Sequence, residues 1–460
     1  MNAHAHAPTH AEHAAQDVAA HLHPFTNLAT HPQIGPLVIT RGDGIFVEDD
    51  QGRRYLEAMS GLWCASLGFS NARLAKAGSD ALHGLPYYHT FNGRSNPAAI
   101  ALAEKLIALA PVPMSKVFFA NSGSEANDSA VKLVWYYHNA IGKPAKKKII
   151  ARKNAYHGVT VVAASLSGLI NNHRDFDLPI DRILHVDCPH HFRYAEPGET
   201  EEDFATRLAD NLEKRILEEG PDTVGAFIAE PVMGAGGVLV PPATYFEKVQ
   251  KVLAKYNVLL IADEVICGYG RTGEMFGSTT FGLKPDILTS AKALSSGYVP
   301  ISAVMVNEKV HAAIAANSGK IGTFGHGFTY SGHPVACAIA LETLKVYEDE
   351  NILAHVKSLV PQFQKALHGY EGRKYVGEVR GVGLIAAIEL YADPAQRVSF
   401  DPAKKAGARL AELALAQGLI VRAMGDAIAF CPALITTSAE MNELFARFDR
   451  AMAIFEETFA

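Results

Sequence analysis

The sequence predicts an α/β fold in which helices cover both faces of a mainly parallel sheet. Three observations predict it. Short runs of apolar, β-favouring residues recur between residues 99 and 330, and stretches of helical periodicity separate them. These runs are continuously apolar instead of alternating, which is typical of strands buried on both faces. After Pro334 the pattern changes to a long helical stretch followed by two strand-rich segments, which predicts a smaller α+β domain.

The predicted strands of the large sheet follow one another along the middle of the chain. Helical periodicity between them is clear in Asp203–Leu217 and in Tyr245–Tyr256. The five runs are KVFFA from Lys116, KKIIAR from Lys147, AFIAEP from Ala226, VLLIADE from Val258 and ISAVMV from Ile301.

The smaller domain is expected to be discontinuous. VEDDQGRRYLEA, from Val47, reads as a hairpin with its turn at Asp50–Gly52. It can join the segments RGVGLIAAIEL, from Arg380, and GLIVRAMGDAIAFCPAL, from Gly418. We therefore expect a flexible tail over 1–22, small-domain parts over 23–75 and 331–460, and a large ligand-binding domain over 76–330.

Composition excludes several classes of protein. With 460 residues, 48% of them hydrophobic and 20% charged, the chain can bury a large core. A net charge of −6 gives no basic footprint for nucleic acid or a membrane surface. No apolar run is long enough for a membrane span, and the N-terminus lacks an export pattern. The 5 cysteines are scattered without a CxxC, so we expect reduced thiols and a cytoplasmic protein.

The first twenty or so residues are rich in alanine and histidine. His4, His6, His10 and His13 could be drawn as a metal site. The Ala-rich flanks offer nothing to orient such ligands, so a frayed polar tail is the favoured interpretation and no metal is expected.

The first motif with chemical meaning is FFANSGSEAND, from Phe118. A strand enters a Ser/Gly turn, and the next helix opens at Glu125. The backbone N–H groups of Ser122, Gly123 and Ser124 would point outward at the helix N-terminus, which favours a phosphate group. The alternative is an ordinary capped helix start. The segment is neither a Walker loop nor a GxGxxG turn.

The second motif is NVLLIADEVICGYGRTG, from Asn257, in which a buried strand delivers Asp263 and Glu264 at its end. A carboxylate there is costly unless it has a cationic partner. A protonated ring nitrogen of a cofactor, a salt bridge to Arg271 and a divalent metal all satisfy that need.

The third motif is ILTSAKALSSGYVPISAV, from Ile287, which places Lys292 between an apolar strand and a Ser/Gly loop. A lysine in apolar surroundings has a lowered pKa and becomes a nucleophile toward aldehydes. The alternative, a solvated surface lysine, fits poorly with the apolar neighbours Leu288, Ala291, Ala293 and Leu294.

In this order the three motifs resemble those of class III aminotransferases, the ω-aminotransferase branch of the fold-type-I pyridoxal-phosphate (PLP) enzymes. The similarity runs from about His23 to Ala451 and is strongest to amine–pyruvate and putrescine–pyruvate aminotransferases. It implies a mainly parallel seven-stranded sheet in a large domain beside a smaller discontinuous one. Further segments that carry the resemblance are AMSGLWCASLGF from Ala58, LPYYHTF from Leu85, RKNAYHG from Arg152, AEPVMGAGG from Ala229, HGFTYSGHP from His326 and LIVRAMGD from Leu419.

The resemblance implies a role for each motif. Lys292 is the expected Schiff-base lysine and proton shuttle, and Asp263 keeps the cofactor's ring nitrogen protonated. Tyr156 and Val265 are expected on opposite ring faces. The other expected cofactor-binding residues are Ser122, Gly123 and Ser124 on the phosphate with Thr329 from a second subunit, His157 beside Tyr156, and Glu230 on the phenolic side.

The resemblance also implies a substrate pocket. Arg422 is expected to bind the carboxylate of the acceptor. Asn92 and Cys431 depart from the family pattern and put the exact pocket shape in doubt. The expected lining residues are Phe25, Met59, Trp63, Phe91 and Ala235; Phe91, like Thr329, would come from the second subunit.

The expected reaction is amino transfer from a primary amine, a diamine or an ω-amino acid to pyruvate, which yields an aldehyde or ketone and alanine. The expected assembly is a homodimer with shared active sites, or a tetramer. Taurine–pyruvate and β-alanine–pyruvate transfer, and other class III reactions, are the enzymatic alternatives. A catalytically silent binding module is disfavoured because Lys292, Asp263 and Tyr156 are all present.

Overall fold

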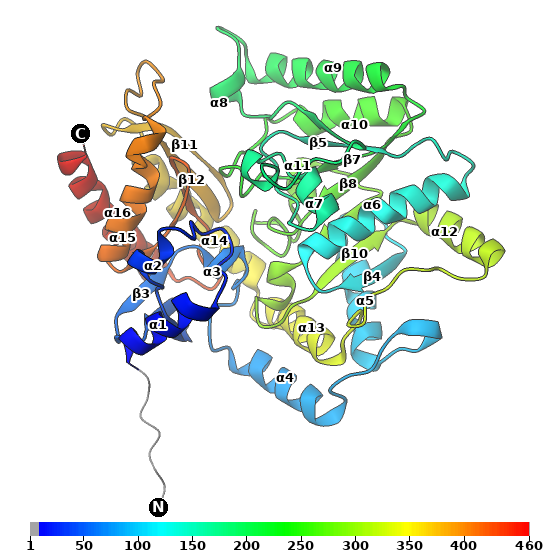
Figure 1. Ribbon diagram of the computed structural model, residues 1–460, viewed down its shortest axis with the longest axis horizontal. Helices are drawn as coiled ribbons and strands as arrows, with labels where there is room; N and C mark the ends of the chain where they lie inside the picture. The colour runs from blue at the N-terminus through cyan, green and yellow to red at the C-terminus, as the bar shows by residue number, and fades with distance from the viewer. Residues whose placement is uncertain (1–8, 460) are drawn as a thin grey trace, which may run out of the picture.

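The computed structural model describes residues 9–459 and contains the expected large sheet (Figure 1). Its seven strands have the order β4-β10-β9-β8-β7-β5-β6. β10 runs antiparallel to β4 and β9, and every other pairing is parallel. The strands are β4 (Lys116–Ala120), β5 (Lys148–Arg152), β6 (Ile183–Val186), β7 (Val224–Ala229), β8 (Leu259–Asp263), β9 (Ile287–Ser290) and β10 (Ser302–Val306).

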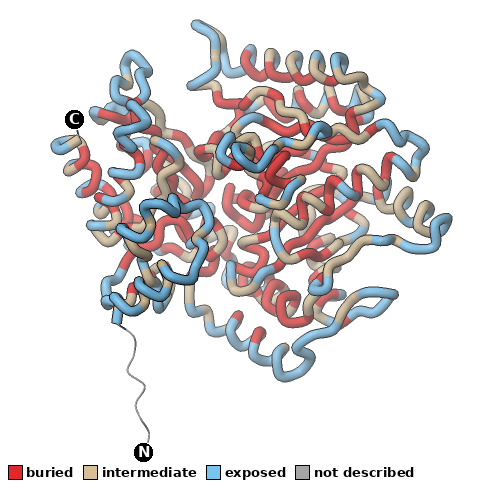
Figure 2. Tube along the Cα trace, viewed as in Figure 1, coloured by how far each residue is buried: buried red, intermediate tan, exposed pale blue. Residues whose placement is uncertain are grey.

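Helices cover both faces of this sheet, as its apolar strands predict. Along β7, Ala226 and Ile228 pack in a cluster with α6, α7 and α12, whereas Phe227 and Ala229 pack in a second cluster with α9 and α10. The strand is buried at every position (Figure 2). The covering helices are α6 (Gly123–Ala140), α7 (Val161–Leu166), α12 (Glu308–Ile321), α9 (Glu201–Glu219) and α10 (Tyr245–Lys255).

Two four-stranded sheets form the rest of the β-structure. One of them is antiparallel and has the order β11-β12-β15-β14. Its strands are β11 (Val376–Val382), β12 (Ile385–Leu390), β14 (Arg422–Met424) and β15 (Ala427–Phe430). The other has the order β1-β2-β3-β13 and consists of β1 (Ile39–Asp43), β2 (Phe46–Asp49), β3 (Arg54–Glu57) and β13 (Leu419–Ile420).

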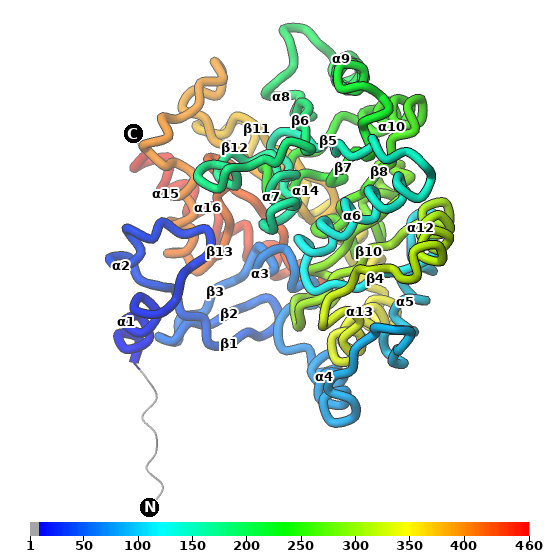
Figure 3. Tube along the Cα trace, turned by 45° about the vertical axis from the view of Figure 1, so that its right-hand side comes forward, coloured from blue at the N-terminus to red at the C-terminus, as the bar shows by residue number. Residues whose placement is uncertain are grey.

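The expected hairpin is present as β2 and β3. β13 pairs in parallel with β3, and Leu419 lies opposite Leu56. Strands from the N-terminal and the C-terminal part of the chain therefore share one sheet (Figure 3). This is the pairing that a discontinuous small domain requires. The remaining longer helices are α4 (Ala72–Gly84), α5 (Pro97–Leu109), α13 (Pro334–Asp349), α14 (Ile352–His368), α15 (Ala406–Ala416) and α16 (Ser438–Thr458).

Short helical turns connect these elements. They are α2 (His31–Ile34), α3 (Ser60–Trp63), η1 (Phe91–Gly93), η2 (Ile170–Asn172), α8 (His191–Tyr194), α11 (Gly277–Phe281), η3 (Lys292–Ser295) and η4 (Pro402–Lys404). No helix of residues 9–459 is both long enough and apolar enough to cross a membrane.

The segment 1–22, for which a flexible tail is expected, contains a helix among its described residues. Residues His10–Ala20 form helix α1, which begins with a capping box between Thr9 and Glu12. His10 and His13 hydrogen-bond through Nδ1 to the carboxylate of Asp50, at distances of 2.9 Å to Oδ1 and Oδ2 respectively. The helix buries none of its residues, so it lacks the apolar stripe by which a sequence reveals a helix. His4 and His6 lie outside the described residues.

Candidate active site

A cavity of about 160 Å³ lies at the carboxyl ends of the parallel strands. Open α/β sheets bind ligands at this edge. Asp263 is the last residue of β8, and Lys292 and Glu230 follow closely after β9 and β7. The predicted site residues that line the cavity are Gly123, Ser124, Tyr156, His157, Glu230, Asp263, Val265 and Lys292.

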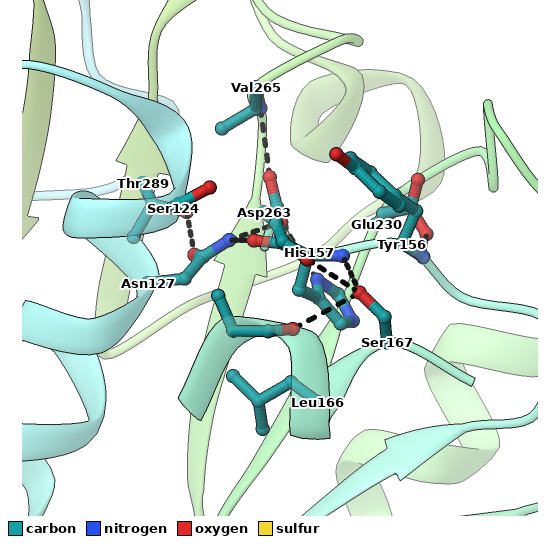
Figure 4. A network of polar contacts seen from close by, with 12 residues as sticks. Ser124, Asn127, Tyr156, His157, Leu166, Ser167, Glu230, Asp263, Val265 and Thr289 are labelled. Carbon is teal, nitrogen blue, oxygen red and sulfur yellow. Dashed lines mark hydrogen bonds and ion pairs between the residues drawn. The ribbon is translucent and has the colours of Figure 1, made fainter. Parts of the chain in front are cut away.

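Asp263 is buried and surrounded by hydrogen-bond donors (Figure 4). Its Oδ2 accepts from Asn127 Nδ2 at 2.8 Å and contacts His157 Nδ1 at 2.7 Å, while its Oδ1 accepts from the Val265 N–H at 3.1 Å. The alternative salt bridge to Arg271 is not formed, because that guanidinium donates to the carbonyl oxygens of Leu384 and Pro432 instead. The carboxylate therefore remains available to a cationic ligand.

Three residues that sequence reasoning missed hold this arrangement. Asn127 accepts a hydrogen bond of 2.8 Å from Thr289 Oγ1 and also donates to the His157 carbonyl at 2.7 Å. Ser167 Oγ accepts the His157 N–H at 2.8 Å. Asn127 lies inside the motif FFANSGSEAND and Thr289 inside the motif ILTSAKALSSGYVPISAV, and these positions were the sequence signals for the two residues.

Lys292 opens the turn η3 in a left-handed conformation, with φ of 47°. A non-glycine residue held there stores backbone strain, which is common at functional sites. Burial lowers the pKa of its amine, and the nearby charges of Asp263 and Glu230 oppose that shift. Among residues 9–459 the amine forms no hydrogen bond or ion pair, so it is ready to act as a nucleophile.

Glu230 fixes the backbone at Tyr156 and at Gly234. Its Oε1 accepts the Tyr156 N–H at 3.0 Å and its Oε2 accepts the Gly234 N–H at 3.1 Å. Burial raises the pKa of this carboxyl group, and His157 opposes the shift. Burial also raises the pKa of the Tyr156 phenol. The Tyr156 ring lies on the same side of the cavity as Glu230 (Figure 4).

A cradle for an anion forms where α6 begins. Ser122 is the N-cap of this 18-residue helix, and its hydroxyl accepts the Glu125 N–H at 3.2 Å. A Cβ on Gly158, whose φ is 131°, would lie 2.4 Å from Ser124 Oγ, and one on Gly123 would lie 3.0 Å from Val265 Cγ1. Only glycine lets the backbone approach this closely. The helix N-terminus adds partial positive charge, which suits a phosphate.

The comparisons with known proteins agree with this geometry. A family model described as Aminotransferase class-III matches residues 28–452. The chain belongs to this family. Gamma-aminobutyrate transaminase 1, mitochondrial, of Oryza sativa subsp. indica is 52% identical over 440 residues, which cover 95% of this chain and 85% of the relative.

Solved structures are similar over almost the same length. The ω-transaminase of Pseudomonas jessenii in complex with PMP has 55% identity and a TM-score of 0.96, covering 96% of this chain and 98% of that one. A transaminase solved with L-ala has 56% identity and a TM-score of 0.91, covering 92% of this chain and 100% of that one. The expected fold class is therefore confirmed.

Class III aminotransferases use PLP, and the described residues fit it. The cavity combines a buried amine, a carboxylate held by hydrogen-bond donors and a helix N-terminus with closely approached glycines. These features suit an aldehyde, a protonated ring nitrogen and a phosphate in turn.

The predicted substrate residues differ in burial, and none of them lines the 160 Å³ cavity. Met59 and Trp63 are buried in one apolar cluster, together with Ile266 and Cys431. Phe25 is 72% exposed, and its ring centroid lies 6.5 Å from that of Tyr156. Ala235 is half-buried.

Phe91 and Thr329 are exposed, and both lie outside the cavity of this chain. Their expected contribution to the site of a second subunit stays a prediction. Ser122 does not line the cavity either. It is the N-cap of α6, and the two residues that follow it, Gly123 and Ser124, line the cavity.

Arg422 is the one cation of the predicted pocket. It lies at the start of β14, and its charge contributes to the pKa shifts of both Tyr156 and Lys292. Burial lowers the pKa of its guanidinium. No carboxylate of residues 9–459 forms an ion pair with it, so the structural salt bridge that would explain a half-buried arginine is not made.

Proposed function

We propose that this aminotransferase moves the amino group of a primary amine, a diamine or an ω-amino acid to pyruvate and so forms alanine. The observation that carries the proposal is Arg422, a half-buried guanidinium beside Tyr156 and Lys292 with no carboxylate partner among the described residues. A planar guanidinium binds a carboxylate through two parallel hydrogen bonds. A small 2-keto acid supplies such a carboxylate next to its reacting carbon.

Two relatives support the two halves of this reaction. A 56% identical transaminase was solved with L-ala, the product of amino transfer to pyruvate. The plant relatives are named for gamma-aminobutyrate, an ω-amino acid whose amine is distant from its carboxylate. Both names describe those proteins and support the same substrate classes here.

Each residue of the cavity has a role in the proposed reaction. PLP, when bound, supplies a reactive carbonyl carbon and an electron-withdrawing ring. Lys292 Nζ would hold the cofactor in the resting enzyme and, once the donor amine has displaced it, would move a proton between the carbon that bears the amino group and the cofactor in each half-reaction. Asp263 would keep the cofactor's ring nitrogen protonated, because Asn127 and His157 hold its carboxylate in place.

The remaining groups orient the cofactor. The N–H groups of Gly123 and Ser124 at the start of α6 would bind its phosphate, together with Thr329 of a second subunit. Val265 and Tyr156 would hold its ring, and Glu230 fixes the Tyr156 backbone.

Replacing Arg422 by alanine tests the proposal. The half-reaction of pyruvate with enzyme loaded with pyridoxamine phosphate should lose about 2–4 kcal/mol of transition-state binding, roughly a 30- to 1000-fold fall in kcat/KM. The half-reaction of an apolar amine with the PLP-loaded enzyme should change only a few-fold, because that donor has no carboxylate. Single-turnover absorbance measurements follow each half separately.

The matched control is Arg422→Lys, which keeps the charge but not the planar pair of donors, and it should fall between wild type and Arg422→Ala. Equal damage to both half-reactions would contradict the role of Arg422. A donor panel of gamma-aminobutyrate, putrescine, β-alanine and taurine, each with pyruvate and with 2-oxoglutarate, tests the substrate class. A clear preference for 2-oxoglutarate with every donor would contradict pyruvate as the acceptor.

A further inference from the structure

A cluster of three imidazoles surrounds Asp17, outside the active site. His23 Nε2 lies 2.7 Å and His31 Nε2 3.1 Å from Asp17 Oδ2, while His21 Nδ1 lies 3.2 Å from Oδ1. The cluster is partly open to solvent, since the His21 side chain is 59% exposed and that of Asp17 is 20% exposed. Neither the fold nor the proposed reaction needs three histidines on one carboxylate.

The local sequence builds this cluster from three places. Asp17 and His21 are four residues apart and share a face of α1, and His21 caps the helix by donating its N–H to the Asp17 carbonyl. His23 follows two residues later. His31 opens the short turn α2 after the chain has doubled back. Ring centroids lie 4.1 Å apart between His21 and His23, and 4.3 Å apart between His23 and His31.

The charge at the cluster favours a cation. Asp17 supplies an anionic oxygen pair within 3.2 Å of nitrogen atoms from three imidazoles. Among residues 9–459 no lysine or arginine pairs with Asp17. Two neutral imidazoles and one carboxylate are ligands that divalent transition metals accept.

A second His/Glu cluster makes a useful contrast. His190, Glu378 and Glu389 also bring their ligand atoms within 4.8 Å of one another. There Arg380 Nη1 donates to both carboxylates, and Arg193 forms an ion pair with Glu389. Fixed guanidinium charges already neutralise that cluster, so it is an ion-pair network and not a metal site.

We propose that Asp17, His21 and His23 bind a divalent transition-metal ion of the zinc, nickel or cobalt class. Their ligand atoms all lie within 4.8 Å of one another. Around an ion with bonds of about 2.0–2.1 Å, such atoms lie roughly 3–4 Å apart, so small side-chain rotations close the site. His31 then hydrogen-bonds to the ligating carboxylate from outside and orients it.

A metal ion at this site would fix the start of a segment that reaches the active site. Residues 24–30 connect His23 to His31, and they carry Phe25, whose ring approaches Tyr156. An ion held by Asp17, His21 and His23 ties the start of this segment to α1, which itself is tied to Asp50 through His10 and His13. The metal therefore acts on the N-terminal segment and not on the chemistry at Lys292.

Isothermal titration of the PLP-loaded enzyme with Zn²⁺ and with Ni²⁺ near pH 7.5 tests the proposal. We expect one ion per chain. Asp17→Asn, which keeps the side-chain shape but removes the charge, and His23→Ala should each lower the affinity at least tenfold. His31→Ala should lower it less, because this residue only orients a ligand. Zn²⁺ should also raise the Tm of the wild-type enzyme and leave that of Asp17→Asn unchanged.

The matched control removes N-terminal histidines other than those of the cluster and those that anchor α1. A variant carrying His4→Ala and His6→Ala keeps the contacts of His10 and His13 with Asp50 and should keep the wild-type affinity. Co²⁺ absorbance gives a second measurement, since the d–d bands of a bound Co²⁺ ion shift when one of its ligands is replaced. Absence of stoichiometric binding would overturn the proposal, and so would binding that survives Asp17→Asn and His23→Ala or disappears in the two-histidine control.

Discussion

Asp263 keeps a carboxylate in a buried position because hydrogen-bond donors surround it. Asn127, His157 and the Val265 backbone supply these hydrogen bonds, and no lysine or arginine among the described residues neutralises the charge. A buried anion arranged in this way is costly in isolation and is stabilised when a cation binds. The arrangement therefore favours a protonated ring nitrogen over a structural ion pair.

Replacing Asp263 by asparagine should slow both half-reactions by two or more orders of magnitude while PLP still binds. The amide cannot stabilise a positive ring nitrogen, so the carbon acid loses most of its activation. Glu264→Gln is the matched control. Glu264 is also buried, but it accepts from Gly277 and Ser278 outside the cavity, and burial raises its pKa to about 7, so a neutral side chain suits it.

Single-turnover rates and PLP content measured on both variants check this prediction. A rate for Asp263→Asn within a few-fold of wild type would show that the carboxylate does not act on the ring.

The sequence predicts Asp263 and Lys292 because they lie at or just after the end of an apolar strand. A charged side chain there is costly unless it has a partner or a function. It does not predict the residues that hold Asp263. Asn127 lies 136 residues before Asp263 and 162 before Thr289, and the three meet only after the sheet has formed. Side-chain partners across that distance depend on the packing of α6 against β8 and β9, which local patterns do not contain.

At the scale of elements, the junction of β4 with α6 and the loop after β5 form the phosphate cradle. The motif FFANSGSEAND predicts the helix start, and its residues occupy that place. The contact between Gly158 and Ser124 was not predicted, since it joins the loop after β5 to the first turn of α6. Two features require glycine at position 158. Its φ is 131°, and a Cβ there would lie only 2.4 Å from Ser124 Oγ.

Gly158→Ala should weaken PLP binding at least tenfold, because the loop must move away from the cradle and adopt a strained conformation worth about 1–3 kcal/mol. Equilibrium dialysis of PLP measures the effect. The control is Gly84→Ala, at the end of α4, where a Cβ meets no atom within 4 Å and PLP affinity should not change. Wild-type PLP affinity in Gly158→Ala would refute the cradle.

The elements missed by sequence reasoning share one physical trait. β6 is a four-residue edge strand with only its end residues fully buried, so its apolar run is too short to stand out. Helix α1 buries no residue and depends instead on its capping box and on Asp50. β6 and part of the anchoring of α1 depend on partners distant in the sequence, whereas the longer strands are recognisable from their continuous apolar composition.

At the scale of the whole molecule, two segments present aromatic side chains to solvent. Tyr87, Tyr88 and Phe91 lie on one, Tyr330 on the other, and all four are exposed. Tyr87 Oη donates to the Thr329 carbonyl at 3.0 Å, so the segments lie together. Such an apolar surface is typical of a subunit interface. It fits the proposal that a homodimer completes each phosphate site with Thr329.

Thr329→Ala should weaken PLP retention, because a hydrogen bond to a charged phosphate contributes about 1.5–3 kcal/mol. Mixed with Lys292→Ala under conditions that exchange subunits, it should regain activity, since one site of each mixed dimer then has both residues intact. Activity of the mixture no greater than the sum of the two variants, or a monomer by light scattering, would contradict the shared site.

The central claim is that the enzyme, with Lys292 as its catalytic residue, transfers an amino group from an amine donor to pyruvate. Incubation with pyruvate and ¹⁵N-labelled putrescine or gamma-aminobutyrate, followed by mass spectrometry, tests it most directly. The account predicts ¹⁵N-alanine in amounts equal to the aldehyde formed, and none from Lys292→Ala, whose Tm should show that it remains folded. Labelled alanine from Lys292→Ala at the wild-type rate, or no labelled alanine from the wild-type enzyme with either donor, would contradict it.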